Sequence, residues 1–315
     1  MLNRILPRPA SDATPTDRAI RWIINHRISG SGIAVHTKSR TASQEVTGYL
    51  IPTLYAWGQQ TLAKDLAAWE AEVQRPDGAF SAPNGVPYTF DTAQVIRGFL
   101  AVLNEMPQLE ANLRRACEFV IGQISEEGEI KTPSYAAWRT RGGEVFSEYT
   151  NLYVLPPLME AGTRLREPSY VHAARRSLIY YTSKPDLVEF KPSFTTLSHI
   201  FGYMLEALID LGEIDLARQG LSQAAEIQRA DGAIPAYPGA AWVCSTGVAQ
   251  LALTWYKLGE AEASRRALAY LERIQHRSGG WFGSYGPGAA YFPNAEISWT
   301  PKFFLDCSVH RKRFS

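Results

Sequence analysis

The sequence contains little cysteine and no long apolar run, and both absences narrow the class of protein. Its 315 residues include only three cysteines, which are widely spaced: Cys117, Cys244 and Cys307. This odd, scattered set indicates neither a disulfide framework nor a Cys-x-x-Cys metal site, so we expect a reducing cytoplasm and no metal. No stretch approaches the ~20 apolar residues of a membrane span. Residues 1–17 contain three prolines and no apolar core of signal-peptide length, so no transmembrane segment or secretion signal is expected.

An excess of charge of one sign is also absent. Lys and Arg number 32 and Asp and Glu number 31, which gives a net charge of +1. Proteins that bind nucleic acid through bulk charge are strongly basic, so the composition predicts no nucleic-acid partner. The one basic cluster lies at the C-terminal end of the chain. We expect an N-terminal extension over 1–15, a single domain over 16–308 and a solvated basic tail over 309–315.

Internal repetition is the strongest positive signal in the sequence. Six times a helical pattern is followed by a loop rich in glycine or proline and then by a second helical pattern. The clearest loops begin at Gln74, Gln228 and Gln275. The period is about fifty residues, which fits two helices of three to four turns and two loops. The second helical patterns begin near Glu45, Asp91, Glu148, His199, Ser245 and Glu296, and glycines that predict helix ends are Gly58, Gly162, Gly212 and Gly259.

The two helices of each repeat differ in their polarity. The second helices are apolar nearly all round, as in 248–256, whereas the first helices, such as 260–273, carry charges on one face. A helix without a charged face is buried on most sides, and hairpins of this kind must stack to bury their apolar surfaces. The sequence therefore predicts an all-α fold, an (α/α)6 toroid or barrel of six helical hairpins with an inner ring of helices wrapped by an outer ring. An open solenoid is the less favoured alternative.

One repeat carries a recognisable motif. The segment 265–275, followed by Gly280 and Trp281, resembles the repeat motif of the terpenoid cyclases, and the loops at Gln74 and Gln228 are related variants. The same toroid serves protein prenyltransferases, glycoside hydrolases, polysaccharide lyases and sugar epimerases, so the resemblance implies a fold rather than one activity. The Asp-x-Asp-Asp run of the squalene-type cyclases is missing, and so is an Asp-x-Cys pair with a downstream His, the zinc site of the prenyltransferases. What remains resembles the carbohydrate-active toroids, such as those of bacterial surface-polysaccharide pathways.

The starts of the inner helices supply the catalytic candidates. In a toroid these starts surround one end of the central cavity. The register places four carboxyl groups and one imidazole there: Glu45, Asp91, Glu148, Glu296 and His199. Glycoside hydrolysis needs a protonated acid and a second carboxylate, and close packing of like charges raises one pKa to supply the acid.

A structural interpretation of the same register stays open. Acids in the first turn of a helix are stabilised by the helix dipole and by free backbone amides, and capping alone produces such a pattern. Ser43, Thr89 and Asn294 have the character of N-caps before these acids. Four prolines fall inside the proposed inner helices, which must bend or start later there, and this bears most on Glu148 and Glu296. These prolines are Pro52, Pro156, Pro157 and Pro301.

Aromatic residues near the inner-helix starts are the candidates for substrate binding, because flat rings stack on sugars. A cation and a second histidine lie near them in the sequence. The full set is Tyr49, Tyr88, Tyr203, Tyr237, Tyr285, Trp299, Arg97 and His36. Trp281, in contrast, is expected to be a core anchor between neighbouring hairpins.

These candidates support several functions. The first is a metal-independent glycan hydrolase that uses paired carboxylates, needs no cofactor and has a glycan as its partner. The second is a polysaccharide lyase or uronate epimerase, in which a Tyr or His abstracts a proton and a cation stabilises the enolate. The third is a non-catalytic glycan-binding or scaffold protein, and the fourth is an isoprenoid-processing enzyme. The sequence leaves the substrate and the oligomeric state open.

Overall fold

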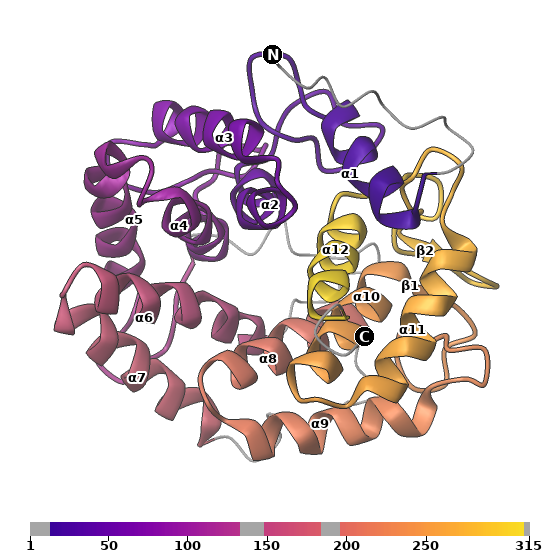
Figure 1. Ribbon diagram of the computed structural model, residues 1–315. Helices are drawn as coiled ribbons and strands as arrows, with labels where there is room; N and C mark the ends of the chain where they lie inside the picture. Colours follow the sequence, from indigo (N-terminus) through magenta and orange to yellow (C-terminus); the bar gives the residue numbers. More distant parts are fainter. Residues whose placement is uncertain (1–12, 133–147, 184–195, 312–315) are drawn as a thin grey trace.

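The computed structural model describes residues 13–132, 148–183 and 196–311. Within these ranges the chain is almost entirely helical and closes on itself as a ring (Figure 1). An inner ring of helices surrounds the centre, and an outer ring wraps it. The predicted (α/α)6 toroid is confirmed.

Outer and inner helices alternate along the chain. The outer helices are α1 (Pro15–Asn25), α3 (Gln60–Val73), α5 (Glu110–Gly122), α7 (Pro168–Thr182), α9 (Ile214–Ile227) and α11 (Ala261–Ile274). The inner helices are α2 (Gln44–Ala56), α4 (Thr89–Val102), α6 (Leu155–Arg164), α8 (Ser198–Asp210), α10 (Ser245–Lys257) and α12 (Trp299–Arg311). A 3-10 turn, η4 (Glu148–Val154), precedes α6, and η2 (Pro107–Leu109) precedes α5. Two short strands, β1 (Val243–Cys244) and β2 (Ser284–Tyr285), pair antiparallel. The last inner helix, α12, packs against the first, α2, which closes the ring and excludes the open solenoid.

Sequence polarity decides which helix lies inside. In α10 every residue from Ser245 to Tyr256 is buried, because α8, α11 and α12 surround it. In α11 the buried residues recur at helical spacing on one face, from Ser264 to Leu271, and charged residues cover the other. A helix with one apolar face packs against neighbours on that face alone, and helices of the outer ring do so.

The repeated glutamines join the outer helices. The Gln275 side-chain amide donates to the carbonyl of Gly279 in its own loop (2.8 Å) and to the carbonyl of Pro15 in α1 (2.9 Å). Its oxygen accepts from the Arg18 guanidinium, also in α1. A Cβ on Gly279 would lie 2.3 Å from the Arg18 carbonyl oxygen, so only glycine fits there. Gln74 and Gln228 make the same bonds to α5 and α11, through Asn112, Arg115, Ala263 and Arg266.

Most of the predicted helix ends are confirmed. Gly58, Gly212 and Gly259 have φ of 75°, 89° and 79° and each lies just past an inner helix. The prediction for Gly162 is wrong, since this residue lies inside α6. A Cβ there would be 2.8 Å from a methyl group of Val171, so this glycine serves the packing of α6 against α7.

Proline explains where the predicted helix starts are wrong. Pro156 and Pro157 lie in the first turn of α6, which therefore starts after the 3-10 turn at Glu148. Pro301 lies in the first turn of α12, so this helix starts at Trp299 and not at Glu296. Pro52 stays inside α2.

Two further predictions concern the C-terminal end of the described chain and the role of Trp281. Residues 309–311 of the predicted tail are helical, because α12 runs to Arg311, whose guanidinium bonds to Glu272 at 2.8 Å. Trp281 is fully buried and its indole N–H donates to the Leu271 carbonyl (2.9 Å), which confirms its predicted role as an anchor. No helix in the described ranges combines the length and apolar character needed to cross a bilayer.

Candidate functional site

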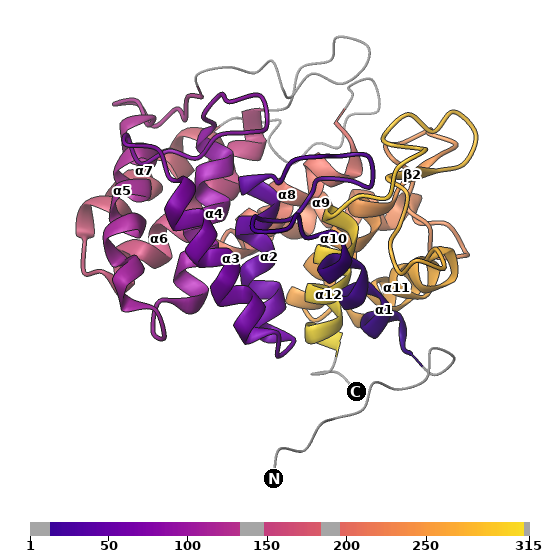
Figure 2. The ribbon, with the colours of Figure 1, turned by 90° about the horizontal axis from the view of Figure 1, so that it is seen from above.

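The inner helices run across the thickness of the ring, so their first turns meet at one end of it (Figure 2). Four predicted residues lie in these first turns: Glu45 of α2, Asp91 of α4, His199 of α8 and Trp299 of α12. Their side chains are buried or half-buried around the ring centre. This end is the candidate site.

Two glycines bring Glu45 and Asp91 onto closely packed helices. A Cβ on Gly48 would lie 2.7 Å from the backbone nitrogen of Val95, and a Cβ on Gly98 would lie 2.7 Å from the carbonyl oxygen of Gly48. The backbones of α2 and α4 therefore touch, one turn inside the two acids. The Asp91 carboxyl group is close enough to Glu45 to feel its charge.

Burial and proximity set the protonation of these two acids. Burial raises the pKa of Glu45 to about 7, against the opposing effect of the Trp299 indole N–H, which donates to its Oε1 at 3.0 Å. Asp91 is 5% exposed, and burial, followed by the charge of Glu45, raises its pKa well above the usual range. The two groups titrate as a pair that holds one proton firmly at neutral pH.

A third carboxyl group lies behind the pair. Glu70, on the outer helix α3, is fully buried, and neither of its oxygens has a hydrogen-bond partner in the described part of the chain. Burial, followed by the charge of Asp91, raises the pKa of Glu70 well above its ordinary value. Glu70 is therefore neutral in the folded protein and adds no charge next to Asp91.

A cluster of aromatic rings spans the centre of the ring beneath the acids. Tyr203 lies at its middle, with ring centroids at 4.7 Å from Tyr153, 5.1 Å from Phe90 and 5.9 Å from Phe303. Four inner elements contribute these rings: α4, η4, α8 and α12. Tyr291 and Trp299, 6.2 Å apart, extend the set toward the rim, by which we mean the end of the ring where the inner helices begin. We call this set the aromatic cluster: Phe90, Tyr153, Tyr203, Tyr291, Trp299 and Phe303.

Tyr49 borders the aromatic cluster. Its ring centroid lies 6.4 Å from that of Phe303, and the Lys302 ammonium lies 5.4 Å from its ring. The Tyr49 hydroxyl is buried and has no hydrogen-bond partner among the described residues. Burial and the charge of Glu45 raise the pKa of this hydroxyl well above 10.

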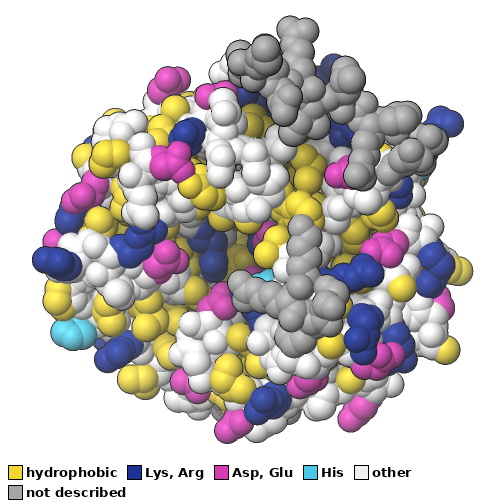
Figure 3. All heavy atoms as spheres, viewed as in Figure 1, with side chains coloured by type: hydrophobic (Ala, Val, Ile, Leu, Met, Phe, Trp, Pro, Cys, Tyr) yellow, Lys and Arg dark blue, Asp and Glu magenta, His cyan; other side chains and the backbone are white. Residues whose placement is uncertain are grey.

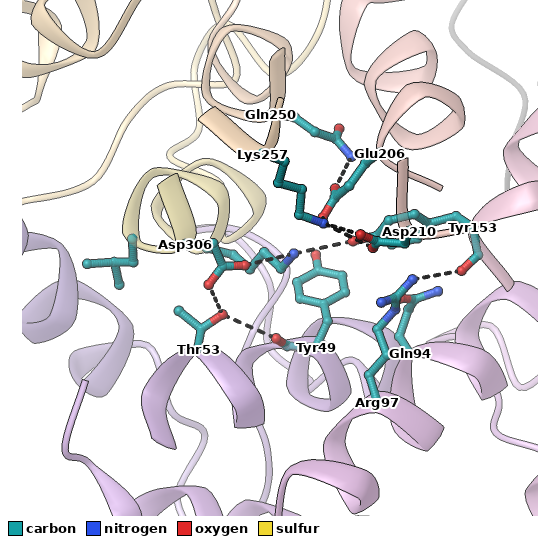
Figure 4. A network of polar contacts seen from close by, with 12 residues as sticks. Tyr49, Thr53, Gln94, Arg97, Tyr153, Glu206, Asp210, Gln250, Lys257 and Asp306 are labelled. Atoms are coloured by element: carbon teal, nitrogen blue, oxygen red, sulfur yellow. Dashed lines mark hydrogen bonds and ion pairs between the residues drawn. The ribbon is translucent and has the colours of Figure 1, made fainter. Parts of the chain in front are cut away.

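A network of charged side chains lies deeper in the ring (Figure 4). The Lys257 ammonium pairs with Glu206 (3.2 Å) and Asp210 (2.7 Å), and that of Lys302 pairs with Asp306 (3.0 Å). Arg97 belongs to this network, because its guanidinium lies 4.1 Å above the Tyr153 ring and donates to the Tyr153 carbonyl at 3.0 Å. The opposite face of the ring is hollowed at its centre, with basic side chains visible inside (Figure 3).

His199 connects the rim to this network. It is 3% exposed, its ring centroid lies 4.4 Å from that of Tyr203, and its Nδ1 lies 2.9 Å from the side-chain oxygen of Gln250. Burial lowers the pKa of His199 to about 3. The imidazole is therefore neutral at physiological pH.

Several predicted site residues lie away from this centre. Glu296 precedes α12 and binds Trp22, Ser278 and His276, which fastens its loop to α1. The hydroxyl of Tyr285 accepts from the Phe282 amide (2.9 Å) and donates to the Ile274 carbonyl (3.3 Å), so both of its hydrogen bonds are to the backbone. The Tyr88 hydroxyl accepts from Asn84 in its own loop.

Three further predicted residues lie at the edge of the site. The His36 ring is 5.2 Å from Phe292, whose ring is 5.9 Å from Trp299. Tyr237 packs against Trp242 in a small apolar cluster that also contacts Tyr291. Glu148 begins η4. The side chain of Glu148 lies outside the described residues.

Most of the aromatic cluster was not predicted from the sequence, and neither were Glu70, Glu206, Gln250 and Lys302. One signal was present in the sequence. Aromatic residues follow the first-turn positions four residues later, in the pairs Glu45 and Tyr49, Tyr149 and Tyr153, His199 and Tyr203, and Trp299 and Phe303. Residues four apart share a helix face, so these rings lie directly below the rim.

No group of three or more His, Cys, Asp or Glu side chains in the described ranges is arranged to hold a metal ion. No family model matches the sequence, and no curated protein matches it either.

Solved structures match the fold. An α-amylase from Clostridium perfringens superposes with a TM-score of 0.72 at 13% identity, over 96% of this chain and 98% of that one. An unsaturated glucuronyl hydrolase specific for heparin gives 0.71 at 11%, over 95% and 96%. A polysaccharide lyase gives 0.67 at 14%, over 97% and 98%. The chain therefore shares one toroid, over nearly its whole length, with proteins that cleave glycans.

Proposed function

We propose that this protein is a carbohydrate-active enzyme, a glycan hydrolase that uses Asp91 and Glu45. The observation that carries the proposal is the carboxyl pair itself. Two acids on touching inner helices lie at the same end of the ring, and burial raises the pKa of both. The aromatic cluster beside them offers flat apolar faces, which suit the carbon–hydrogen faces of sugar rings. The solved toroids that hydrolyse or cleave glycans support the same class of substrate.

The two acids have different roles in hydrolysis, one as the general acid and the other as the general base. Asp91, the more buried, keeps its proton and gives it to the glycosidic oxygen as the bond between that oxygen and the anomeric carbon breaks. Glu45, half-buried and ionised above its pKa of about 7, takes a proton from the water that adds to the anomeric carbon. The Trp299 indole N–H holds the Glu45 carboxylate in place. The enzyme works in a reducing cytoplasm, in keeping with three free, buried cysteines.

A specific observation favours a second candidate, a polysaccharide lyase. The Tyr49 hydroxyl has no hydrogen-bond partner among the described residues, and the Lys302 ammonium lies 5.4 Å from its ring. A Tyr–Lys pair suits proton abstraction next to a uronate carboxylate. An unsaturated product, seen by its ultraviolet absorbance, distinguishes this reaction from hydrolysis.

Paired substitutions test the hydrolase against helix capping. On a panel of neutral and acidic oligosaccharides, we expect Asp91→Asn and Glu45→Gln to lower turnover by about 10²-fold or more. Their melting temperatures should stay within a few degrees of the wild-type value. The matched control is Glu262→Gln, because Glu262 is a first-turn acid of α11 that faces solvent. If all three variants lose stability equally and retain turnover, the acids are only caps.

A further inference from the structure

A chain of four side chains runs from the charged network to the candidate site. The Lys257 ammonium lies 3.2 Å from Glu206 Oε1. Glu206 Oε2 accepts from the Gln250 side-chain nitrogen at 3.1 Å, and Gln250 Oε1 lies 2.9 Å from Nδ1 of His199. All but Lys257 are nine-tenths buried or more, so water does not replace these bonds.

Only one arrangement of protons satisfies this chain. Burial favours the neutral form of Glu206, but Lys257, Lys302 and Arg97 outweigh it and lower its pKa to about 2. An ionised carboxylate only accepts hydrogen bonds, so Gln250 must turn its NH₂ group toward Glu206 and its oxygen toward His199. An amide oxygen also only accepts, so Nδ1 of His199 carries the proton. In a neutral imidazole the other nitrogen, Nε2, then has a free lone pair.

Two glycines make room for this chain of hydrogen-bonded side chains between α8 and α10. A Cβ on Gly202 of α8 would lie 2.8 Å from Gln250 Oε1, and one on Gly247 of α10 would lie 1.9 Å from Ser198 Oγ. Gly202 therefore leaves room for the Gln250 side chain against α8, and Gly247 brings the α10 backbone close to Ser198 and to the backbone nitrogen of His199. The tautomer of His199 is thus set by rigid elements rather than by a loop.

The unpaired nitrogen of His199 belongs to the candidate site. No described residue donates to Nε2, and the rings around the imidazole are those of Tyr203, Phe303, Trp299 and Tyr291, at 4.4, 5.9, 6.2 and 6.3 Å. Trp299 is also the donor to Glu45. A sugar that stacks on Trp299 beside Glu45 therefore presents its hydroxyls to His199.

We propose that Nε2 of His199 is a permanent hydrogen-bond acceptor for a sugar hydroxyl, held in one tautomer by Gln250, Glu206 and Lys257. This rests on the glycan specificity proposed above and makes it narrower. A hydroxyl has a proton to donate to this acceptor, whereas a carboxylate has none and would be repelled by the lone pair. The position next to Glu45 therefore selects a neutral hexose over a uronate, and Gln250 is a positioning residue.

Nitrogen NMR of the full-length protein with ¹⁵N-labelled histidine tests the tautomer directly. We expect His199, assigned with His199→Asn, to have a protonated Nδ1 and an unprotonated Nε2 between pH 5 and pH 8. In Gln250→Met the two tautomers should mix. The matched control is Gln228→Met, because the Gln228 side chain bonds to the outer helix α11 and not to this chain, and it should leave the His199 signals unchanged. A protonated Nε2 in the wild-type protein would overturn the proposal.

A second measurement tests the ligand. Glucose, galactose and mannose are titrated against glucuronate and galacturonate, with the Nε2 resonance of His199 as the readout. At least one neutral hexose should shift this resonance, the uronates should not at equal concentration, and Gln250→Met should bind that hexose about tenfold more weakly. An equal response to uronates, or no response to any hexose, refutes the proposal. Because neither experiment needs turnover, an Nδ1–H tautomer without glycan cleavage counts against the hydrolase alone.

Discussion

At the scale of single residues, burial of ionisable groups away from water determines the properties of the site. Burial is the largest influence on the pKa of Glu45, Asp91, Glu70 and His199. It raises the pKa of each acid and lowers that of the histidine, so neutral forms are favoured throughout. Glu206 is the exception, because three cations keep it ionised. The rim is therefore rich in groups that exchange or accept protons, and the charges lie deeper.

Glu70 should make the protein less stable as pH rises. The pKa of Glu70 in the folded protein lies above the ordinary value of 4.5. Below pH 4.5 this carboxyl group is therefore protonated in both the folded and the unfolded protein, and stability is not reduced. Above it the unfolded chain ionises while the folded protein does not, which favours unfolding. Glu70→Gln should therefore melt higher than wild type at pH 8, by about 2–4 °C for each kcal/mol recovered, and match it at pH 4. A melting difference that does not change between these pH values would contradict the assignment.

The register of the sequence predicted Glu45, Asp91, His199 and Trp299 as site residues, and the structure brings these four together. It did not predict their protonation, because burial arises from helices far apart in the chain. Glu70 illustrates the limit. In sequence it is one more acid on an outer helix, and only packing against α4 shows that it has no access to water.

At the scale of elements, backbone contact between neighbouring inner helices sets the geometry of the site. Gly48 and Gly98 allow α2 and α4 to touch, Gly247 brings α10 close to the backbone nitrogen of His199 in α8, and Gly202 leaves room for the Gln250 side chain. Each glycine lies inside a helix, where the residue type costs about 1 kcal/mol relative to alanine. That cost is offset by the close packing that it permits.

Gly48→Ala should destabilise the protein and weaken catalysis together. The added methyl group would meet the backbone of Val95 and Gln94, neither of which can move aside, so we expect a loss of about 1–3 kcal/mol in urea unfolding. Turnover should fall as α2 and α4 separate. Gly122→Ala in α5 is the control, since nothing lies within 4 Å of its new methyl group, and it should be neutral or stabilising. Equal stability of the two variants would refute this account of the helix contact.

The helices themselves were largely predictable, and their starts were not. Periodicity and glycine ends gave the order of inner and outer helices. Proline altered two starts, because its ring fits best in the first turn of a helix, although Pro52 lies inside α2. The shift at Pro301 moved Glu296 out of α12, where its carboxyl group binds Trp22 instead of the rim.

At the scale of the whole molecule, the ring is closed by the same bonds that join its repeats. The bond set of Gln275 to α1 repeats that of Gln74 to α5 and Gln228 to α11. The repeated sequence motif is thus a set of side-chain bridges between outer helices. This is why repetition predicted the fold although no family model matches.

Gln275→Leu tests the closure. It removes the bonds to Gly279, Pro15 and Arg18, and we expect a loss of about 1–3 kcal/mol. Hydrogen exchange should quicken in α1 and α11 together, and remain slow in α6 and α7. Gln123→Leu is the control, because Gln123 is the C-cap residue of α5, as Gln275 is of α11, but its side chain makes no hydrogen bond to a described residue. Unchanged protection of α1 would show that the ring does not depend on this bridge.

The central claim is that Glu45 and Asp91 form a carboxyl pair whose pKa values are raised for catalysis. Carbon NMR of protein labelled at the glutamate carboxyl, with Glu45→Gln for assignment, measures it most directly. Glu45 should titrate near pH 7, and the rate of glycan hydrolysis should fall below that pH as Glu45 takes up its proton. Titration of Glu45 near its ordinary value of 4.5 would contradict the account.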